Sequence, residues 1–464
     1  MRSPRFSLRF CAPALFLAAV SGLAACQMPF GKRDAAPVAP ATPAMTQGPC
    51  VVLTLPASGP YAPISGKIGR GAVLARQELA ADGIKIRLET VNTETPDWLA
   101  KLSALPPACA VVGGPLQARN YTHARSAGAV DQRAFFTFLP SLEQGDEGAR
   151  AWRFFPSPQD QIDALIAFAT DGLNIRTYGA FYPSDAYGAR MTGMLEQSLA
   201  GRNMPLRKAV YDSTDVSSWS AAVAPLINAT QAEGSGTPVP QTAFEALFLP
   251  DSWKNMDMLT TSLLLNGEDR LVLLGTTLWE QSLSGKVVPN AEKYALAVFP
   301  GAWNAARAPG TLQAPGNDFW VALGYDFTRF AVNLGLNSRL TTPEITARAG
   351  RAAQRIRGMA PIKWDGAGVA HQQLFIFQAS PTGMTPLNLE QFQQTRTTVL
   401  QRAALRMQGL PAVDAEGNPL VPDLPPAAGQ TLGMPSAQPA TTPPALPLSS
   451  TPQPSYKLRL PTRR

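Results

Sequence analysis

The sequence has few of the residues that carry metal and acid–base chemistry. Its 464 residues include only two histidines and four cysteines, and 16% of the chain is charged. No CxxC pair is present, so the common zinc-binding patterns have no ligands. Long blocks of like charge are also missing, as are basic runs interleaved with aromatic residues. This composition argues against a metalloprotein and against a nucleic-acid-binding protein.

Motifs of the common enzyme classes are missing as well. There is no GxSxG elbow and no GxGxxG after a strand. Gly66-Lys67 follows Gly59, but the spacing is not that of a P-loop, and Ile68 stands where Ser or Thr would bind magnesium. His371, beside an apolar strand predicted at 374–377, is interpreted as a structural residue. We therefore expect no catalytic residues, no metal and no cofactor.

The first 26 residues have the pattern of a secretory signal. Arg2, Arg5 and Arg9 precede an apolar run at 11–20 that is too short for a stable membrane span. The run ends in LAAC at 23–26, which resembles the bacterial lipobox. This resemblance implies a chain that begins at a lipidated Cys26 after cleavage. Without the three leader arginines the net charge falls from +7 to about +4, which is only mildly basic.

Low-complexity segments flank the predicted globular part. Residues 27–48 are rich in Pro and Ala and predict a spacer between the lipid and the globular body. Residues 410–464 repeat this composition, with 13 of the chain's 44 prolines at 411–464, and predict a disordered tail with a solvated basic end. Between these flanks about 360 residues remain, enough for two domains of ordinary size.

Between the flanks, strand-like and helix-like patterns alternate. An apolar run at 51–55 is followed by helical spacing from Ile68 to Leu79, a strand pattern at 84–89, a weak helix at 98–105 and an apolar strand at 110–112. This βαβαβ order predicts a parallel sheet. The pattern restarts at residues 157–160, SPQD, a helix start with a capping Ser, Pro at the first position and an acid at the third. Strands at 177–182, 206–211, 246–249 and 271–274 alternate with further helices up to residue 274.

Two such units in tandem predict two Rossmann-like lobes with a cleft between them. We assign residues 49–155, together with about 300–400, to the first lobe and residues 156–299 to the second. Ligands of such folds bind beyond the carboxyl ends of the strands.

Two of the four cysteines, Cys11 and Cys26, lie in the predicted signal. The other two predict a disulfide in the first lobe. Cys50 directly precedes the first strand and Cys109 the third, and in a sheet of order 2-1-3 these strands are parallel neighbours. Their ends would then lie about 5 Å apart, within reach of a bridge. Two buried free thiols are the alternative.

Several motifs resemble those of type 1 periplasmic solute-binding proteins of the leucine/isoleucine/valine-binding kind. They are LPASGPY at 55–61 with Gly66 and Gly71-Ala72, and YPSDAYG at 182–188. A narrower set resembles lipoproteins called penicillin-binding protein activators: VVGGPL at 111–116, LFLPD at 247–251, LLGTTLW at 273–279 and GYD at 324–326. The resemblance covers roughly residues 50–400. It implies a non-enzymatic, two-lobed binding fold.

The predicted binding cleft is made of residues that follow strands of both lobes. The set comprises Ser58, Tyr61, Gly114, Pro115, Tyr187, Asp251, Trp253, Thr276 and Trp279. The resemblance places Tyr187 beside the ligand, although a Tyr packed at a helix start is an equal alternative. The third-strand loop at 114–118 has no hydroxyl to bind a carboxylate, so a standard free amino acid is a poor candidate ligand.

Two functions follow from the resemblance. The first is a regulator that contacts a peptidoglycan synthase, a penicillin-binding protein, from the periplasmic face of the outer membrane. The second is a lipid-anchored receptor that delivers branched-chain amino acids or related solutes to an ABC permease.

Overall fold

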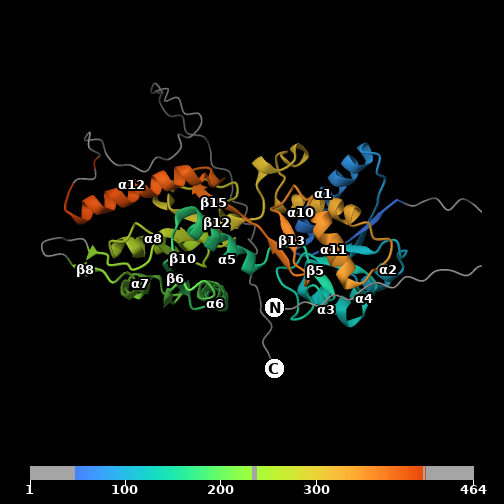
Figure 1. Cartoon of the computed structure of the whole chain (residues 1–464), viewed down its shortest axis with the longest axis horizontal. Coiled ribbons are helices and arrows are strands. Elements are labelled where there is room, and N and C mark those ends of the chain that lie inside the picture. Colours follow the sequence, from blue (N-terminus) through green and yellow to red (C-terminus); the bar gives the residue numbers. More distant parts are fainter. Residues whose placement is uncertain (1–47, 232–237, 411–412, 414–464) are drawn as a thin grey trace, which may run out of the picture. The chain divides into compact units, whose positions relative to one another are not determined.

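The computed structural model describes residues 48–231, 238–410 and 413 (Figure 1). The predicted signal with Cys26, nearly all of the spacer and the tail from residue 414 lie outside the described residues. Within the described ranges, no helix is both long enough and apolar enough to cross a membrane.

The first lobe is built on a five-stranded parallel sheet of order β2-β1-β3-β4-β5. The inner strand CVVLTL is buried along its whole length, as expected for a parallel sheet covered on both faces. The strands are β1 (Cys50–Leu55), β2 (Arg87–Asn92), β3 (Val111–Gly113), β4 (Ala134–Thr137) and β5 (Ala151–Arg153). The order agrees with the predicted 2-1-3 arrangement.

The second strand lies later in the chain than its sequence pattern predicted. The alternation of Ile84, Ile86 and Leu88 predicted a strand at 84–89, whereas β2 runs from Arg87 to Asn92. The register explains the shift, because Cys50 at the start of β1 pairs with Arg87. Residues 84–86 lead into the sheet without joining it.

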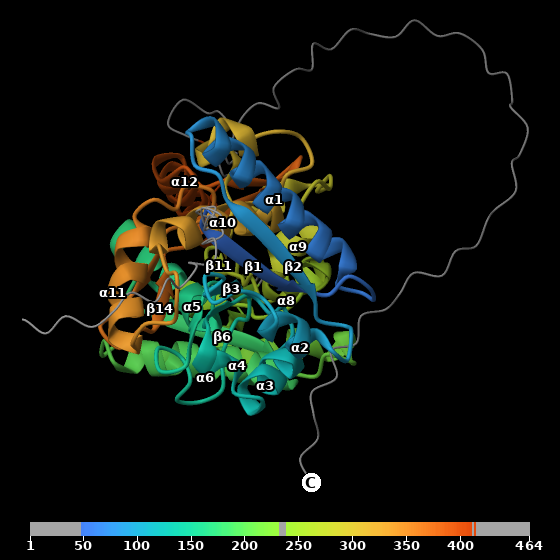
Figure 2. The ribbon, with the colours of Figure 1, turned by 90° about the vertical axis from the view of Figure 1, so that its right-hand side faces the viewer.

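Helices cover both faces of this sheet, and α1 is prominent in Figure 2. They are α1 (Ala62–Ala81), α2 (Trp98–Ser103), α3 (Ala118–Ser126), α4 (Ala129–Gln132), α10 (Phe319–Leu334) and α11 (Thr342–Ala353), with the short turns η5 (Ala305–Arg307) and η6 (Gly310–Leu312) before α10. A two-stranded hairpin, β13 (Ile362–Trp364) and β14 (Ala370–Gln372), follows α11.

Two glycines bring α1 and α10 together. A Cβ on Gly71 would lie 1.9 Å from the Val321 carbonyl oxygen, and a Cβ on Gly324 would lie 1.9 Å from that of Ile68. Gly71-Ala72 and GYD, two motifs that carried the family resemblance, therefore serve helix packing in this lobe. In the same helix, Asp326 is buried and accepts hydrogen bonds from the backbone N–H groups of residues 357–359.

The second lobe is built on a seven-stranded sheet of order β16-β15-β12-β11-β10-β6-β7. Its parallel part contains β6 (Tyr178–Pro183), β7 (Leu206–Tyr211), β10 (Ala246–Phe248), β11 (Val272–Leu274) and β12 (Ala297–Gly301). Two strands are added antiparallel at one edge, β15 (Phe375–Ser380) and β16 (Gly383–Pro386). Outside the sheet, β8 (Thr230–Gln231) and β9 (Pro238–Val239) form a small ribbon.

The helices of the second lobe begin with α5, whose start has the predicted capping box. The Ser157 side chain accepts from the Asp160 N–H, and the Asp160 carboxylate accepts from the Ser157 N–H. The helical segments are α5 (Pro158–Ala167), η1 (Phe168–Gly172), α6 (Ala186–Ala200), η2 (Val216–Ser218), α7 (Trp219–Ile227), η3 (Trp253–Asn255), α8 (Met256–Leu265), α9 (Leu278–Leu283), η4 (Ala291–Tyr294) and α12 (Leu389–Met407).

The segment 300–400 is divided between the lobes instead of belonging to the first. Residues of α10, α11 and β13 join the core of the first lobe, whereas β15 and β16 extend the second sheet. Phe392 and Val399 of α12 pack into the core of the second lobe. Figure 1 shows α12 with the green elements of the second lobe and α11 with the elements of the first. The pairing of β15 with β12 decides this division, and apolar patterning alone does not reveal it.

Three connections join the two lobes, at residues 154–157, 302–318 and 373–374. The Arg153 side chain, 3% exposed, fixes the first connection to the third: it donates to Asp160 Oδ2 at 2.8 Å and to the carbonyl oxygen of Ala370. The other Asp160 oxygen accepts from the Gln372 N–H at 3.0 Å. This buried ion pair holds together the chain segments that pass between the lobes.

Candidate functional site

A cavity of about 580 Å³ is lined by residues of both lobes and of the connections between them. We call it the interlobe cavity. Its lining residues are Pro140, Phe155, Pro156, Gln161, Thr277, Glu280, Gln281, Ser284, Ala302, Trp303, Asn304, Ala305, Ala306, Asn317, Asp318, Phe319, Trp320, Phe377, Met384 and Pro386. The volume is that of a site for a small organic molecule.

The second lobe contributes the turn that follows β11. Thr277 precedes α9, and its N–H and hydroxyl both donate to Gln161 Oε1, at 3.1 and 3.2 Å. Gln161 lies on α5 and is buried, so this contact fixes the β11 turn against the helix that opens the second lobe. The amide nitrogen of Gln161 has no hydrogen-bond partner among the described residues.

The first lobe contributes the start of α10. Asp318 caps this helix, because its Oδ1 accepts from the N–H groups of Trp320 and Val321 at 3.1 and 3.3 Å. Its Oδ2 pairs with Lys67 of α1 at 2.5 Å. The negative charge of the Asp318 carboxylate is therefore partly neutralised by Lys67.

Aromatic rings line this side of the cavity. The rings of Phe155 and Phe319 meet edge to face at 5.4 Å, and Phe155 lies 5.7 Å from Trp320. All three residues are only partly buried, which leaves ring surface free. Such surface contacts apolar groups and the faces of organic cations.

Glu280 of α9 is the ionisable residue on the opposite, second-lobe side. Burial, and to a lesser extent the nearby charge of Asp318, raises the pKa of its carboxyl to about 7. Among the described residues, no hydrogen bond or ion pair involves the Glu280 carboxyl group, although its backbone carbonyl accepts from the Ser284 N–H. A carboxyl group without partners at a pKa near neutrality is a candidate ligand-binding group.

The five predicted residues of the second lobe lie together. The Tyr187 hydroxyl donates to Thr276 Oγ1 at 3.1 Å, and Trp279 Nε1 donates to the Asp251 carbonyl oxygen at 2.9 Å. The Trp253 and Trp279 rings meet edge to face at 5.3 Å. Burial raises the pKa of the Tyr187 hydroxyl. These residues do not line the interlobe cavity, and the side chains of Thr276 and Trp279 are fully buried in the core.

The four predicted residues of the first lobe lie at the carboxyl ends of β1 and β3, and they are not among the lining residues of the cavity either. Ser58 and Tyr61 are exposed, and Tyr61 directly precedes α1. Gly114 has φ +94°, and a Cβ there would lie 2.6 Å from the Thr54 carbonyl oxygen. Gly114 and Pro115 are joined by a cis peptide bond. Glycine at 114 is thus explained by backbone packing.

Sequence analysis missed most of the cavity residues. Glu280, Asp318, Phe155 and Trp320 line the cavity, and none of them is among the residues predicted from the sequence. The only signal in the sequence is that Asp318 directly precedes an apolar helix pattern, which is a capping signature. Their common location depends on the connections between the lobes, and spacing within one lobe does not reveal it.

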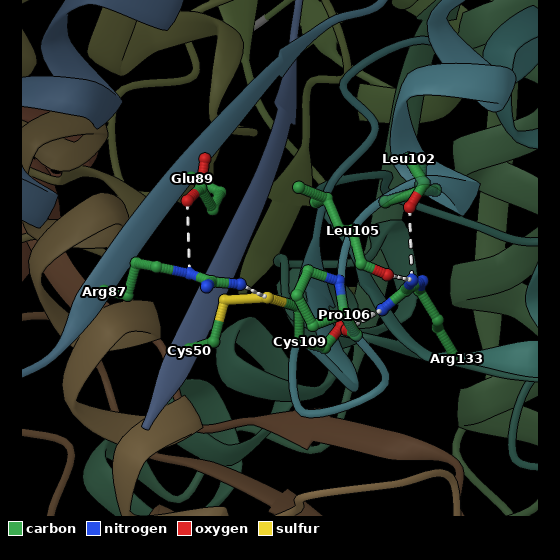
Figure 3. Close-up of a disulfide and its surroundings, with 8 residues drawn as sticks. All are labelled: Cys50, Arg87, Glu89, Leu102, Leu105, Pro106, Cys109 and Arg133. Carbon is green, nitrogen blue, oxygen red and sulfur yellow. Dashed lines mark hydrogen bonds and ion pairs between the residues drawn. A yellow bond between two sulfur atoms is a disulfide. The ribbon is translucent and has the colours of Figure 1, made fainter. Parts of the chain in front are cut away.

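The predicted pair Cys50 and Cys109 is joined by a disulfide in the structure, with the Cα atoms 4.7 Å apart (Figure 3). Beside it, the buried Arg133 guanidinium donates to the carbonyl oxygens of Leu102, Leu105 and Cys109 and ties the loop before β3 to β4. The disulfide lies at the amino ends of β1 and β3, away from the carboxyl ends where Gly114 lies. Its role is therefore structural.

Among the described residues, no group of three or more His, Cys, Asp and Glu side chains is placed to hold a metal ion. His371 is exposed on β14, and its Nε2 lies 3.5 Å from Asp365. The cavity itself offers one acid without a partner, four side-chain amides and aromatic surface. This set is suited to binding a solute.

No protein-family model and no curated protein matches this sequence. Several solved structures match the chain in fold. A putative branched-chain amino acid ABC transporter from Rhodospirillum rubrum is 12% identical, with a TM-score of 0.55, and covers 73% of this chain and 100% of its own. The C-domain of LpoA from Haemophilus influenzae, described as a regulator of PBP1A, is 14% identical, with a TM-score of 0.50 over 73% of this chain and 100% of its own.

Full-length LpoA from Haemophilus influenzae is 13% identical, with a TM-score of 0.54, over 74% of this chain. The match covers 59% of that protein. At these identities the likeness is one of fold, and the two groups of neighbours match about equally well.

Proposed function

Since the chain has the fold of type 1 periplasmic binding proteins, we propose that it is a non-enzymatic, exported binding protein anchored to lipid through Cys26. It takes a small solute into the interlobe cavity. Through its lobes it regulates a peptidoglycan synthase of the penicillin-binding protein class, from the periplasmic face of the outer membrane. The observation that carries the binding function is the cavity of about 580 Å³ shared by both lobes.

The chemistry of the cavity supports binding over catalysis. Its described lining residues include no histidine and no cysteine, and no hydrogen bond joins the Ser284 hydroxyl to a carboxyl group among them. Glu280 and Asp318 come from different lobes, so the position of one relative to the other depends on how the lobes close. A solute held between them would couple occupancy to lobe closure.

The choice of partner rests on the sequence motifs. VVGGPL, LFLPD, LLGTTLW and GYD resemble those of penicillin-binding protein activators, and LpoA shares the fold. A tethered regulator also suits a Pro-rich spacer after Cys26.

A receptor for an ABC permease is the second candidate, and the cavity between the lobes favours it. A solute receptor needs such a cavity, whereas a regulator of a synthase can act through its outer surface. The fold is shared with a putative branched-chain amino acid transporter.

Cross-linking in intact cells followed by affinity purification and mass spectrometry tests the partner. We expect a peptidoglycan synthase in the purified fraction. Recovery of a permease with its ATPase would support the second candidate and contradict the first.

Acyl labelling tests the anchor separately. The wild-type chain should incorporate labelled fatty acid and sediment with membranes, and Cys26→Ala should abolish both. Labelling that persists in this variant would contradict the lipid anchor.

A further inference from the structure

The interlobe cavity has an uneven distribution of charge. Its described lining includes two carboxyl groups, Glu280 and Asp318, and no lysine or arginine. Lys67 reaches Asp318 from α1 but does not line the cavity. Arg307 lies over the Phe375 ring at 5.5 Å and lines a different cavity, and Lys286 follows α9 in an exposed turn.

We propose that the cavity binds a small organic cation that has no carboxylate, held between Glu280 of the second lobe and Asp318 of the first. This inference rests on the proposed solute-binding function and deepens it. The two acids belong to different lobes, so a cation between them would stabilise the arrangement in which the lobes approach.

The aromatic residues define the kind of cation. Phe155, Phe319 and Trp320 present partly free ring surface on the side of Asp318. Alkylammonium groups interact favourably with such rings, whereas a hydrated metal ion does not lose its water there. A substituted ammonium group therefore fits this wall better than an inorganic ion.

The remaining polar groups suit a neutral substituent. Of the four side-chain amides of the lining, Gln161 and Asn304 have their oxygens occupied by Thr277 and by the Ala306 N–H, so these two keep their NH₂ groups for a ligand. The NH₂ group of Asn317 already donates to the carbonyl oxygens of Thr311 and Leu312. The NH₂ groups of Gln161 and Asn304 suit a hydroxyl or carbonyl oxygen. A ligand carboxylate would lie near two acids without a cation to pair with, because no lysine or arginine lines the cavity and Lys67 is paired with Asp318.

Calorimetric titration of the full chain in detergent tests the inference, with choline as the cation. Dimethylbutanol, in which carbon replaces the charged nitrogen, is the neutral control of the same shape, and leucine is the zwitterion. We expect choline to bind at least about tenfold more tightly than either. Equal affinity for dimethylbutanol or leucine, or no heat with choline, would overturn the proposal.

The pH dependence is a second readout. The choline affinity should rise between about pH 6 and about pH 8, on either side of the Glu280 pKa of about 7, because a bound cation displaces the proton of the carboxyl. Glu280→Gln should weaken choline binding at least about tenfold and remove this dependence. Glu292→Gln, an exposed acid outside the cavity, should change neither.

A ring variant separates charge recognition from folding. Trp320→Leu should weaken choline binding more than dimethylbutanol binding, because only the cation gains from the ring face. An unchanged ratio in Trp320→Leu together with unchanged binding in Glu280→Gln would overturn the proposal.

Native mass spectrometry of protein released from envelopes distinguishes a failure of the cationic-ligand proposal from a failure of the solute-binding function. A bound neutral or zwitterionic solute would overturn the proposal of a cationic ligand while supporting solute binding. A bound amine or quaternary ammonium would support both.

Discussion

Glu280 connects the cavity to the stability of the fold. Its pKa in the folded chain is about 7, above the usual 4.5, because burial and Asp318 disfavour the charged form. A raised pKa means that the folded state binds the proton more tightly than the unfolded state. The stabilisation is therefore fully present below about pH 4.5 and is lost as the pH rises through about 7.

We predict that Glu280→Gln flattens the pH dependence of stability between about pH 5 and about pH 8, because Gln cannot ionise. The wild type should lose up to about 3 kcal/mol of unfolding free energy over this range relative to the variant. Urea denaturation at several pH values measures this difference. Glu292→Gln is the control, and a wild-type slope in Glu280→Gln would contradict the assignment.

The disulfide gives a second prediction for single residues. Replacing both Cys50 and Cys109 with Ala should lower the unfolding free energy by about 2–4 kcal/mol, because the bridge closes a long loop in the unfolded chain. Reductant should lower the urea midpoint of the wild type and leave the double variant unchanged. Full thiol labelling of Cys50 and Cys109 in the denatured, unreduced wild type would contradict the bridge.

At the scale of elements, the close crossing of α1 and α10 requires glycine at positions 71 and 324, where a hydrogen atom stands in place of a Cβ. A Cβ on Gly71 would meet the Val321 carbonyl oxygen at 1.9 Å, so the two helices would have to separate. We predict that Gly71→Ala destabilises the chain by at least about 2 kcal/mol. Thermal or urea denaturation measures the change.

Gly69 provides a matched control in the same helix. A Cβ at Gly69 has no atom within 4 Å, so Gly69→Ala should gain up to about 1 kcal/mol from the helix preference of Ala. Equal effects of the two substitutions would show that helix propensity, and not the close crossing, determines the change in unfolding free energy.

At the scale of the whole molecule, the connections between the lobes depend on the buried Arg153. Arg153→Met would leave Asp160 as a buried carboxylate without its cation and the Ala370 carbonyl oxygen without this donor. We predict a loss of about 3–5 kcal/mol in unfolding free energy. Arg150→Met, which removes an exposed pair with Asp131 at 3.5 Å, should cost less than about 1 kcal/mol. A comparable loss in both variants would contradict the role of the connections.

Much of the local structure follows from the sequence alone. Continuous apolar runs predicted the parallel strands β1, β3, β10 and β11, because strands covered on both faces bury every side chain. The SPQD motif predicted the start of α5, because its capping groups act within one turn. The positions of Cys50 and Cys109 at the starts of adjacent strands predicted their pairing. Each of these features depends on neighbours in the chain or on one sheet.

The candidate site was decided by the tertiary structure. The β15 strand returns to the second sheet by pairing with β12, and the connections then bring Asp318 and Phe155 to the same cavity as Glu280. Residues at strand ends, such as Thr276 and Trp279, were expected to face a ligand but are buried in the core. Periodicity determines which face of an element is apolar, and so the sequence determined the elements and the sheets. Which polar groups face one another across two lobes depends on contacts between distant segments, and only the folded chain decides it.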